Sequence, residues 1–292
     1  MEQGFFTALG TSFDSEGHFC EASFSKQIED QMESGASGLL AMGSMGQQPY
    51  ITNGEYTKVA SCAAKAAKGK CPVLVGVMDT SIARVLDRVK AVEKLSIDGV
   101  VVTAPYYYTA TQAQLLTFYQ GIADASPYPV YLYDLPPVAG ISIASNTIRG
   151  LWNHSNIRGI KSGNLVTMRT LMRDPAKPKD FDLIFSNLDE FDIAYSYGIK
   201  KNLDGMLSCT PKTTSKLFTS MKNADFAKAG DYLDQIISLR DLFVGAGSVF
   251  GAFTYAMNLL GYKGNFSPDY MGVLTDEHQA PIRECLERMG EL

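Results

Sequence analysis

A lysine at position 161 has the sequence context of a nucleophile. Lys161 ends the apolar run Ile157–Lys161, and the small residues Ser162 and Gly163 follow it. If the run is a strand, the amine points into a confined space at its end, and removal from water favours the neutral amine over the ammonium. A neutral amine attacks a carbonyl carbon and forms an imine. The alternative is a lysine whose long side chain reaches solvent from the strand end.

Two further segments carry groups that suit the same chemistry. Tyr133 ends the run Val130–Tyr133, and a phenol held close to reacting atoms transfers protons. A half-buried tyrosine whose hydroxyl only finds a partner is the plainer interpretation. The segment Gly43–Gly46 follows another apolar run, and its backbone N–H groups, aided by the Ser44 hydroxyl, suit a carboxylate. By itself such a turn is weak evidence.

The elements that must position these residues alternate in type. Short apolar runs are followed by longer stretches with helical periodicity, and strands that are apolar throughout are typical of parallel sheets covered on both faces. Eight runs in roughly 220 residues predict a closed (β/α)8 barrel, a fold that usually takes about 250 residues. A doubly wound open sheet is the competing arrangement, but no GxGxxG follows the first run. The expected strands are Phe5–Gly10, Gly38–Met42, Val73–Val77, Gly99–Thr103, Val130–Tyr133, Ile157–Lys161, Asp182–Phe185 and Leu203–Ser208.

We expect the barrel to occupy residues 1–223 and a C-terminal helical appendage to occupy residues 224–292. Strand signals stop near the boundary, and the stretches that follow have helical character. In such a barrel the reacting groups lie at the carboxyl ends of the strands, so the residues above would share one end. The expected appendage helices are Asp225–Phe243, Ser248–Leu260 and Glu277–Met289.

Composition and charge exclude several classes of protein. The 26 Lys and Arg residues against 31 Asp and Glu leave a net charge of -5, which gives little attraction for nucleic acid or an anionic membrane. Neither an export signal nor a run of 18 apolar residues is found, so we expect no membrane span. Five cysteines without CxxC spacing favour reduced thiols in a cytoplasm. The histidines His18, His154 and His278 form no ligand motif, so we expect no metal and no cofactor.

The chain resembles the dihydrodipicolinate synthase/N-acetylneuraminate lyase family of class I, Schiff-base-forming lyases. The resemblance covers essentially the whole chain, and the Tyr133 and Lys161 motifs are its specific part. It is carried, in order, by TALGTSFD (residues 7–14), GSMGQ (43–47), APYYY (104–108), YDLPPVAG (133–140), GIKSG (159–163) and SNLDE (186–190).

The resemblance implies roles for the matching positions. Lys161 forms an imine with the ketone carbon of pyruvate or of a longer 2-keto acid. Tyr133 relays protons during imine formation and carbon–carbon bond cleavage. Ser44 and the amide of Met45, in the turn that ends at Gly46, hold the carboxylate, and Ser44 also joins the proton relay.

Three consecutive tyrosines, Tyr106 to Tyr108, follow the fourth run. They cannot all face one way, so we expect at least one to leave its own site for a loop or an interface. Packing alone would also explain them. The resemblance implies that Tyr107 reaches into a neighbouring subunit's site, and hence a homo-oligomer, usually a tetramer built from dimers.

Departures from the family pattern bear on the substrate. In the synthase branch an arginine at the position of Val138 binds the carboxylate of an amino-aldehyde, and valine cannot make that pair. Synthase activity is therefore disfavoured. Met45 replaces a usual threonine and Gln47 a usual glutamate, which predicts altered substrate affinity. Gly163 stands where the N-acetylneuraminate lyase branch usually carries a threonine.

Other residues are similar to that lyase branch, in which an Asp-Glu pair and a serine bind the hydroxyl groups of a sugar-acid tail. Asp189, Glu190 and Ser208 match them, and Ser186 opens the same segment. Carboxylates accept hydrogen bonds from polyol hydroxyls, although helix capping would also explain the acidic pair. We therefore expect Met45, Gly46 and these four residues to contact the substrate.

The predicted activity is that of an aldolase that converts a hydroxylated 2-keto-3-deoxy acid, similar to sialic acid or to a sugar acid, to or from pyruvate and an aldehyde. The same imine chemistry also allows a dihydrodipicolinate synthase or a 2-keto-3-deoxy sugar acid dehydratase. A non-catalytic sugar-acid sensor is a further alternative, motivated by Met45 and Gln47.

Overall fold

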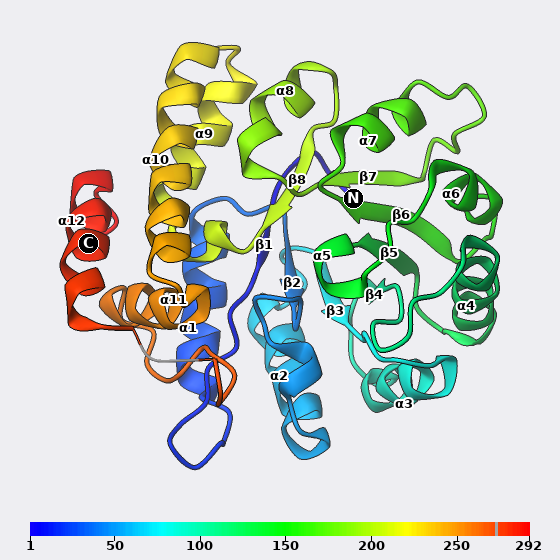
Figure 1. Cartoon of the computed structure of the whole chain (residues 1–292), viewed down its shortest axis with the longest axis horizontal. Helices are drawn as coiled ribbons and strands as arrows, with labels where there is room; N and C mark the ends of the chain where they lie inside the picture. Colours follow the sequence, from blue (N-terminus) through cyan, green and yellow to red (C-terminus); the bar gives the residue numbers. More distant parts are fainter. Residues whose placement is uncertain (272–273) are drawn as a thin grey trace.

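Eight parallel strands close into a barrel in the computed structural model, which describes residues 1–271 and 274–292 (Figure 1). Strands that are neighbours in the sequence are neighbours in the barrel, and β8 pairs with β1 to complete the circle. The predicted (β/α)8 barrel is confirmed. Its strands are β1 (Gly4–Ala8), β2 (Gly38–Ala41), β3 (Val73–Gly76), β4 (Gly99–Thr103), β5 (Val130–Asp134), β6 (Ile157–Ser162), β7 (Asp182–Phe185) and β8 (Lys201–Asp204).

Helices follow the strands and most of them surround the barrel, whereas the short helix after β5 lies near the middle of the view (Figure 1). They are α1 (Glu21–Glu33), α2 (Asn53–Ala67), α3 (Ile82–Val92), α4 (Gln112–Ala125), α5 (Pro136–Ala139), α6 (Ser145–Leu151), α7 (Leu165–Met172), α8 (Phe191–Ser196) and α9 (Pro211–Lys222). Short 3-10 helices also lie in the connections after strands: η1 (Gln48–Tyr50), η2 (Leu188–Glu190) and η3 (Met206–Cys209).

Three helices follow the barrel: α10 (Phe226–Gly245), α11 (Val249–Leu259) and α12 (Asp276–Met289). Their bounds agree with the expected helices within two residues. Helix α10 packs against α8 and α9, and α12 packs against α10 and α11 at the far edge of the molecule (Figure 1). The appendage is therefore tied to the barrel near β7 and β8. The division of the chain at residue 223 stays a prediction.

The predicted position of the last strand was wrong. The sequence predicts a strand over Leu203–Ser208, whereas β8 ends at Asp204 and the apolar residues that suggested the strand form η3. The end residues of β8, Lys201 and Asp204, are charged and half-buried, so little of this strand is apolar. The apolar run that predicted the strand therefore lies further toward the C-terminus. As a consequence Asp204 ends the strand, and Ser208 lies beyond it.

Every strand buries both of its faces, and β4 illustrates the pattern. Val101 points into the barrel, while Val100 and Val102 pack against the outer helices. This explains why the runs lack polar alternation. The inward residues form the barrel-interior cluster: Phe6, Ala8, Leu40, Leu74, Val101, Tyr131, Tyr133, Ile184 and Leu203.

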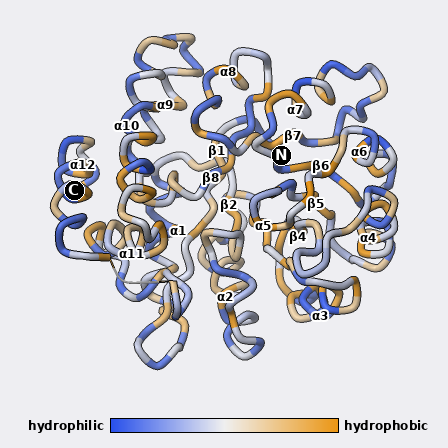
Figure 2. Tube along the Cα trace, viewed as in Figure 1, coloured by the Kyte–Doolittle hydropathy of each residue, from blue (hydrophilic) through white to orange (hydrophobic). Residues whose placement is uncertain are grey.

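Hydropathy along the chain follows this arrangement. Figure 2 shows hydrophobic stretches along the central strands and hydrophilic stretches in the outer loops, including the loop between α7 and β7. Within the part of the chain that the structure describes, no helix is both long and apolar enough to cross a membrane.

Candidate active site

The carboxyl ends of β5 and β6 bring Tyr133 and Lys161 together inside the barrel. The two residues are partners in the strand register, and each is only 5% exposed. Lys161 Nζ lies 3.9 Å from the centre of the Tyr133 ring, where the ring face attracts a cation. It also donates a 2.8 Å hydrogen bond to the hydroxyl of Ser186, which follows β7. The structure therefore holds this amine away from water at a strand end.

The turn after β2 reaches the same group through Ser44. Its hydroxyl donates to the Tyr133 hydroxyl at 3.4 Å, a long contact of the kind that tightens when a substrate binds. We call Ser44, Tyr133, Lys161 and Ser186 the Lys161 group. It joins the ends of β2, β5, β6 and β7 around one amine.

Backbone geometry prepares the turn for an anion. Among the described residues, the N–H groups of Ser44 and Met45 donate to no protein acceptor. A Cβ atom on Gly46 would lie 2.9 Å from the Leu9 carbonyl oxygen, so the turn can pack this closely only with glycine there. Consecutive free N–H groups in a tight turn bind carboxylates and phosphates.

Gln47 and Met45 support the turn from either side. Gln47 is buried with a left-handed φ of 57°, and its side-chain amide donates a 2.9 Å bond to the Thr11 carbonyl. The side chain of Gln47 thus ties the turn to the loop after β1. The Met45 side chain packs against Gly205, because a Cβ atom there would overlap it. Met45 therefore contributes its backbone to the turn and its side chain to packing against the loop after β8.

The rim of the barrel holds an ion pair that the sequence did not predict. Arg240 of α10 donates to both carboxylate oxygens of Asp189, at 2.5 and 3.0 Å. These bonds hold the pKa of Asp189 below its ordinary value. The neighbouring Glu190 accepts a 3.2 Å bond from the amide of Asn187. Because α10 is remote in sequence, no local pattern connects Arg240 with this rim.

Asp204 is a second residue that the sequence analysis missed. It ends β8 and lies half-buried near the amine. Burial raises the pKa of the Asp204 carboxyl, while a 2.9 Å bond from the Met206 N–H and the positive charges of Lys161 and Arg240 oppose the rise. Candidate site residues were sought at the carboxyl ends of the expected strands. Because the last strand was expected to end at Ser208, Asp204 was placed inside it and was not considered.

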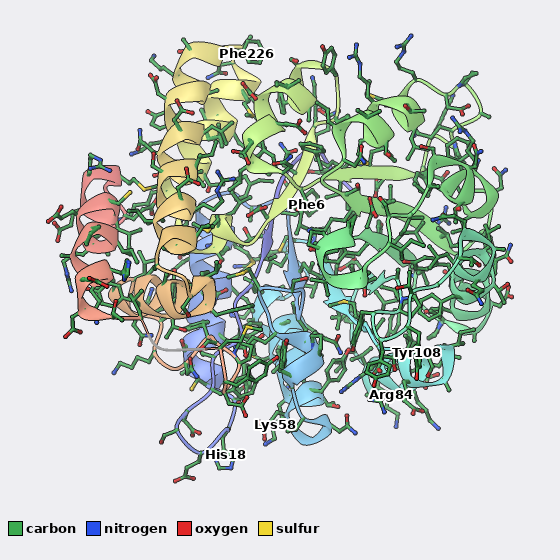
Figure 3. The ribbon with its side chains drawn as sticks, viewed as in Figure 1. Phe6, His18, Lys58, Arg84, Tyr108 and Phe226 are labelled. Atoms are coloured by element: carbon green, nitrogen blue, oxygen red, sulfur yellow. The ribbon has the colours of Figure 1, made fainter. Side chains whose placement is uncertain are left out.

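Two predicted residues lie apart from the Lys161 group. Ser208 is fully buried in η3, and its hydroxyl donates a 2.6 Å bond to the Gly205 carbonyl. Tyr107 is 76% exposed, and its ring packs edge-on against Tyr108 with centroids 4.9 Å apart. Figure 3 shows Tyr108 near the edge of the molecule, away from Phe6 in the barrel interior. The roles of Ser208 and Tyr107 stay predictions.

The assembled groups suit a 2-keto acid. The shielded Lys161 amine can attack the ketone carbon, and the Tyr133 phenol lies against this amine. The turn after β2, with its free N–H groups, can bind the carboxylate. In residues 1–271 and 274–292, no three His, Cys, Asp or Glu side chains gather into a metal-binding group.

Comparison with known proteins agrees with this chemistry. The profile of the dihydrodipicolinate synthetase family matches residues 1–289. The chain belongs to this family. A relative from Bradyrhizobium diazoefficiens, named 4-hydroxy-tetrahydrodipicolinate synthase, is 30% identical over 290 residues, which are 99% of this chain and 97% of the relative. The resemblance inferred from the motifs is confirmed, and the protein is an enzyme of the pyruvate-dependent class I aldolase type.

Solved structures share the dihydrodipicolinate synthetase fold over the full length. YagE from E. coli K12, a prophage protein in complex with pyruvate, has a TM-score of 0.91 at 20% identity and covers 100% of both chains. CdNal from Clostridium difficile, in complex with mannosamine, has a TM-score of 0.89 at 17% identity and covers 99% of each chain. At these identities the likeness establishes the fold.

Proposed function

We propose that this enzyme cleaves or forms a hydroxylated 2-keto-3-deoxy acid, with pyruvate and an aldehyde as the partners. The observation that carries the proposal is the environment of the Lys161 amine. Lys161 is 5% exposed, and its amine lies over the face of the Tyr133 ring and donates a hydrogen bond to Ser186. Such an amine serves as a nucleophile toward a ketone.

The chemistry runs through an imine. The neutral Lys161 amine attacks the ketone carbon, and the carbinolamine loses water to give a protonated imine. The imine withdraws electrons, so the bond between the third and fourth carbons breaks, the aldehyde leaves and the electrons remain as an enamine. The enamine takes a proton at its terminal carbon, and water then hydrolyses the imine to pyruvate and the free amine. The same steps in reverse form the longer acid.

Tyr133 and Ser44 move the protons that these steps require. The Tyr133 phenol gives its proton to the hydroxyl that leaves the carbinolamine as water. The resulting phenolate takes the proton of the substrate hydroxyl as the aldehyde forms, and returns it to the terminal carbon of the enamine. The Ser44 hydroxyl, 3.4 Å away, connects the phenol with the turn. In this proposal the carboxylate lies on the N–H groups of Ser44 and Met45, with Gly46 keeping the turn tight.

Acidic residues at the rim suit the hydroxylated tail of a sugar acid. Asp189 and Glu190 present carboxylates that accept hydrogen bonds from the hydroxyls of an acid's tail, and Ser186 lies between this rim and the Lys161 amine in this proposal. A Cβ atom on Gly163 would lie 2.7 Å from the Ser186 carbonyl oxygen. The threonine of the N-acetylneuraminate lyase branch therefore cannot be placed here without moving Ser186.

The synthase reaction is the second candidate, because the Bradyrhizobium relative carries that name. Against it, Val138 on α5 offers an exposed apolar side chain where a carboxylate-bearing aldehyde would need a cation. A sensor without turnover needs neither the Lys161 amine nor the Tyr133 phenol.

Product analysis tests the proposal. The enzyme is incubated with 2-keto-3-deoxy sugar acids of increasing chain length, and separately with pyruvate and a carboxylate-bearing amino-aldehyde. Release of pyruvate plus an aldehyde is expected. Loss of water without pyruvate would establish a dehydratase instead, and turnover only with the amino-aldehyde would establish the synthase.

We also propose a cytoplasmic homotetramer built from dimers. The exposed Tyr107 and Tyr108 rings suit an interface in which Tyr107 enters a neighbour's site. All five cysteines lie among the described residues as free thiols, which suits a reducing compartment. Light scattering after gel filtration should give the mass of four chains, and Tyr107→Phe should slow turnover without changing that mass. A monomer with full activity would contradict this assembly.

A further inference from the structure

Thr103 carries a buried hydroxyl without a partner inside the barrel. Its side chain is 3% exposed, and its hydroxyl oxygen makes no hydrogen bond within the described residues. The residue is on the same face of β4 as Val101 of the barrel-interior cluster, whereas Val102 packs outward. The hydroxyl therefore faces the barrel interior.

The strand register places this hydroxyl beside the Lys161 group. Thr103 is the register partner of Tyr133, which is in turn the partner of Lys161. Three consecutive strands thus present a hydroxyl, a phenol and an amine side by side to the same interior space. The side chain of Asn202 also has no hydrogen-bond partner among residues 1–271 and 274–292, but its neighbour Leu203 belongs to the barrel-interior cluster, so Asn202 faces outward.

The chain that enters the turn after β2 lies against β3, the strand between β2 and β4. A Cβ atom on Gly76 would overlap the Met42 carbonyl, so the chain entering the turn leans over β3. The terminal methyl of Met78 lies 3.2 Å from the same position, so the Met78 side chain lines this space beside β4. In the turn itself the Ser44 hydroxyl is bonded to Tyr133, and Met45 has no hydroxyl to offer.

We propose that Thr103 is a substrate-binding residue whose hydroxyl donates a hydrogen bond to the carboxylate of the bound 2-keto acid. The inference rests on the proposed function. A buried hydroxyl without a partner costs free energy in the protein without substrate. A carboxylate accepts several hydrogen bonds at its two oxygens. The substrate therefore supplies the partner that the protein lacks. The N–H groups of the turn and Thr103 hold the carboxylate from two sides, while the ketone meets Lys161.

Matched variants separate this role from a structural one. Thr103→Val keeps the shape and removes the hydroxyl, and Thr103→Ser keeps the hydroxyl. Thr57→Val, at an exposed position of α2, is the control. Borohydride trapping at a series of pyruvate concentrations gives the half-saturating concentration for each protein, and thermal unfolding without pyruvate gives its stability.

Thr103→Val should raise the half-saturating pyruvate concentration about tenfold, and Thr103→Ser should restore most of the affinity. Without pyruvate, Thr103→Val should melt no lower than the wild type, because it removes an unpaired hydroxyl. An unchanged half-saturating pyruvate concentration in Thr103→Val, or a lower melting temperature of this variant without pyruvate, would overturn the role of Thr103. Neither result would affect the proposed function. Absence of trapping in the wild type would instead remove the proposed function on which it rests.

Discussion

The Asp134 carboxylate accepts a 2.8 Å hydrogen bond from the Ser162 hydroxyl, and these residues directly follow Tyr133 and Lys161 in the chain. Both are almost fully buried. The carboxylate also accepts a 3.0 Å bond from the Ile143 N–H. Asp134 therefore joins the ends of β5 and β6 behind the phenol and the amine, and it fixes how the two groups face each other.

Asp134→Asn should slow catalysis without touching the substrate. In the wild type, the Ile143 N–H and the Ser162 hydroxyl donate to different oxygens of the carboxylate. An asparagine amide has only one acceptor oxygen, so one of these bonds is lost and the ends of β5 and β6 should shift. We expect a loss of about tenfold or more in kcat and of about 1–3 kcal/mol in the free energy of unfolding. Asp231→Asn, on the exposed side of α10, is the control. A variant with the wild-type kcat would show that this bond does not position the site.

Arg240→Gln should reveal the pH dependence of the rim ion pair. Because Arg240 lowers the pKa of Asp189 in the folded protein, the pair stabilises the fold above the ordinary aspartate pKa of about 3.9. That contribution disappears as the pH falls through the lowered value. The pair is half-exposed and screened, so at pH 7 the variant should be less stable by at most about 1 kcal/mol.

Melting temperatures of wild type and Arg240→Gln from about pH 7 to pH 3 check this sign. The difference should shrink toward acid and in high salt, and Arg283→Gln at an exposed position of α12 should show no such trend. A difference that grows toward acid would contradict the assignment.

Gly163→Ala should disturb the partner of the amine. The added Cβ atom would lie 2.7 Å from the Ser186 carbonyl oxygen, so the backbone of Ser186 must move, and its hydroxyl bond with Lys161 is disturbed. We expect lower stability and slower trapping of pyruvate by borohydride. Gly230→Ala is the control, because a Cβ there meets nothing within 4 Å and alanine favours the helix. If Gly163→Ala traps pyruvate as fast as the wild type, the position of the Ser186 hydroxyl beside Lys161 does not matter for imine formation.

Val138→Arg tests the substrate branch. An arginine on the exposed face of α5 supplies the cation that a carboxylate-bearing aldehyde requires. We expect unchanged pyruvate trapping and a gain of condensation with the amino-aldehyde over the wild type. A large loss of pyruvate affinity would show that α5 borders the pyruvate pocket more closely than proposed.

The fold was predictable because its signal is local and repeated. The strands Gly99–Thr103 and Asp182–Phe185 were predicted with the bounds that the structure has, since burial on both faces of a strand leaves an apolar run. The last strand was misplaced because its charged ends lie half-buried in the barrel, a property of the closed tertiary structure.

The site was predictable only where strand ends determine it. Lys161 and Tyr133 end adjacent strands, and parallel pairing places them together. Arg240 meets Asp189 through the packing of α10 on the barrel, and Thr103 is distinguished by its missing partner. Both properties depend on three-dimensional packing, which no run of residues encodes locally.

Borohydride reduction in saturating pyruvate, followed by peptide mass spectrometry, tests the central claim most directly. Reduction converts an imine into a stable amine, so the adduct records which nitrogen joined the ketone. We predict one reduced pyruvate adduct in the wild type, on the peptide that contains Lys161, and none in Lys161→Ala that still folds. An adduct on a different lysine, or equal labelling of both proteins, would contradict the account.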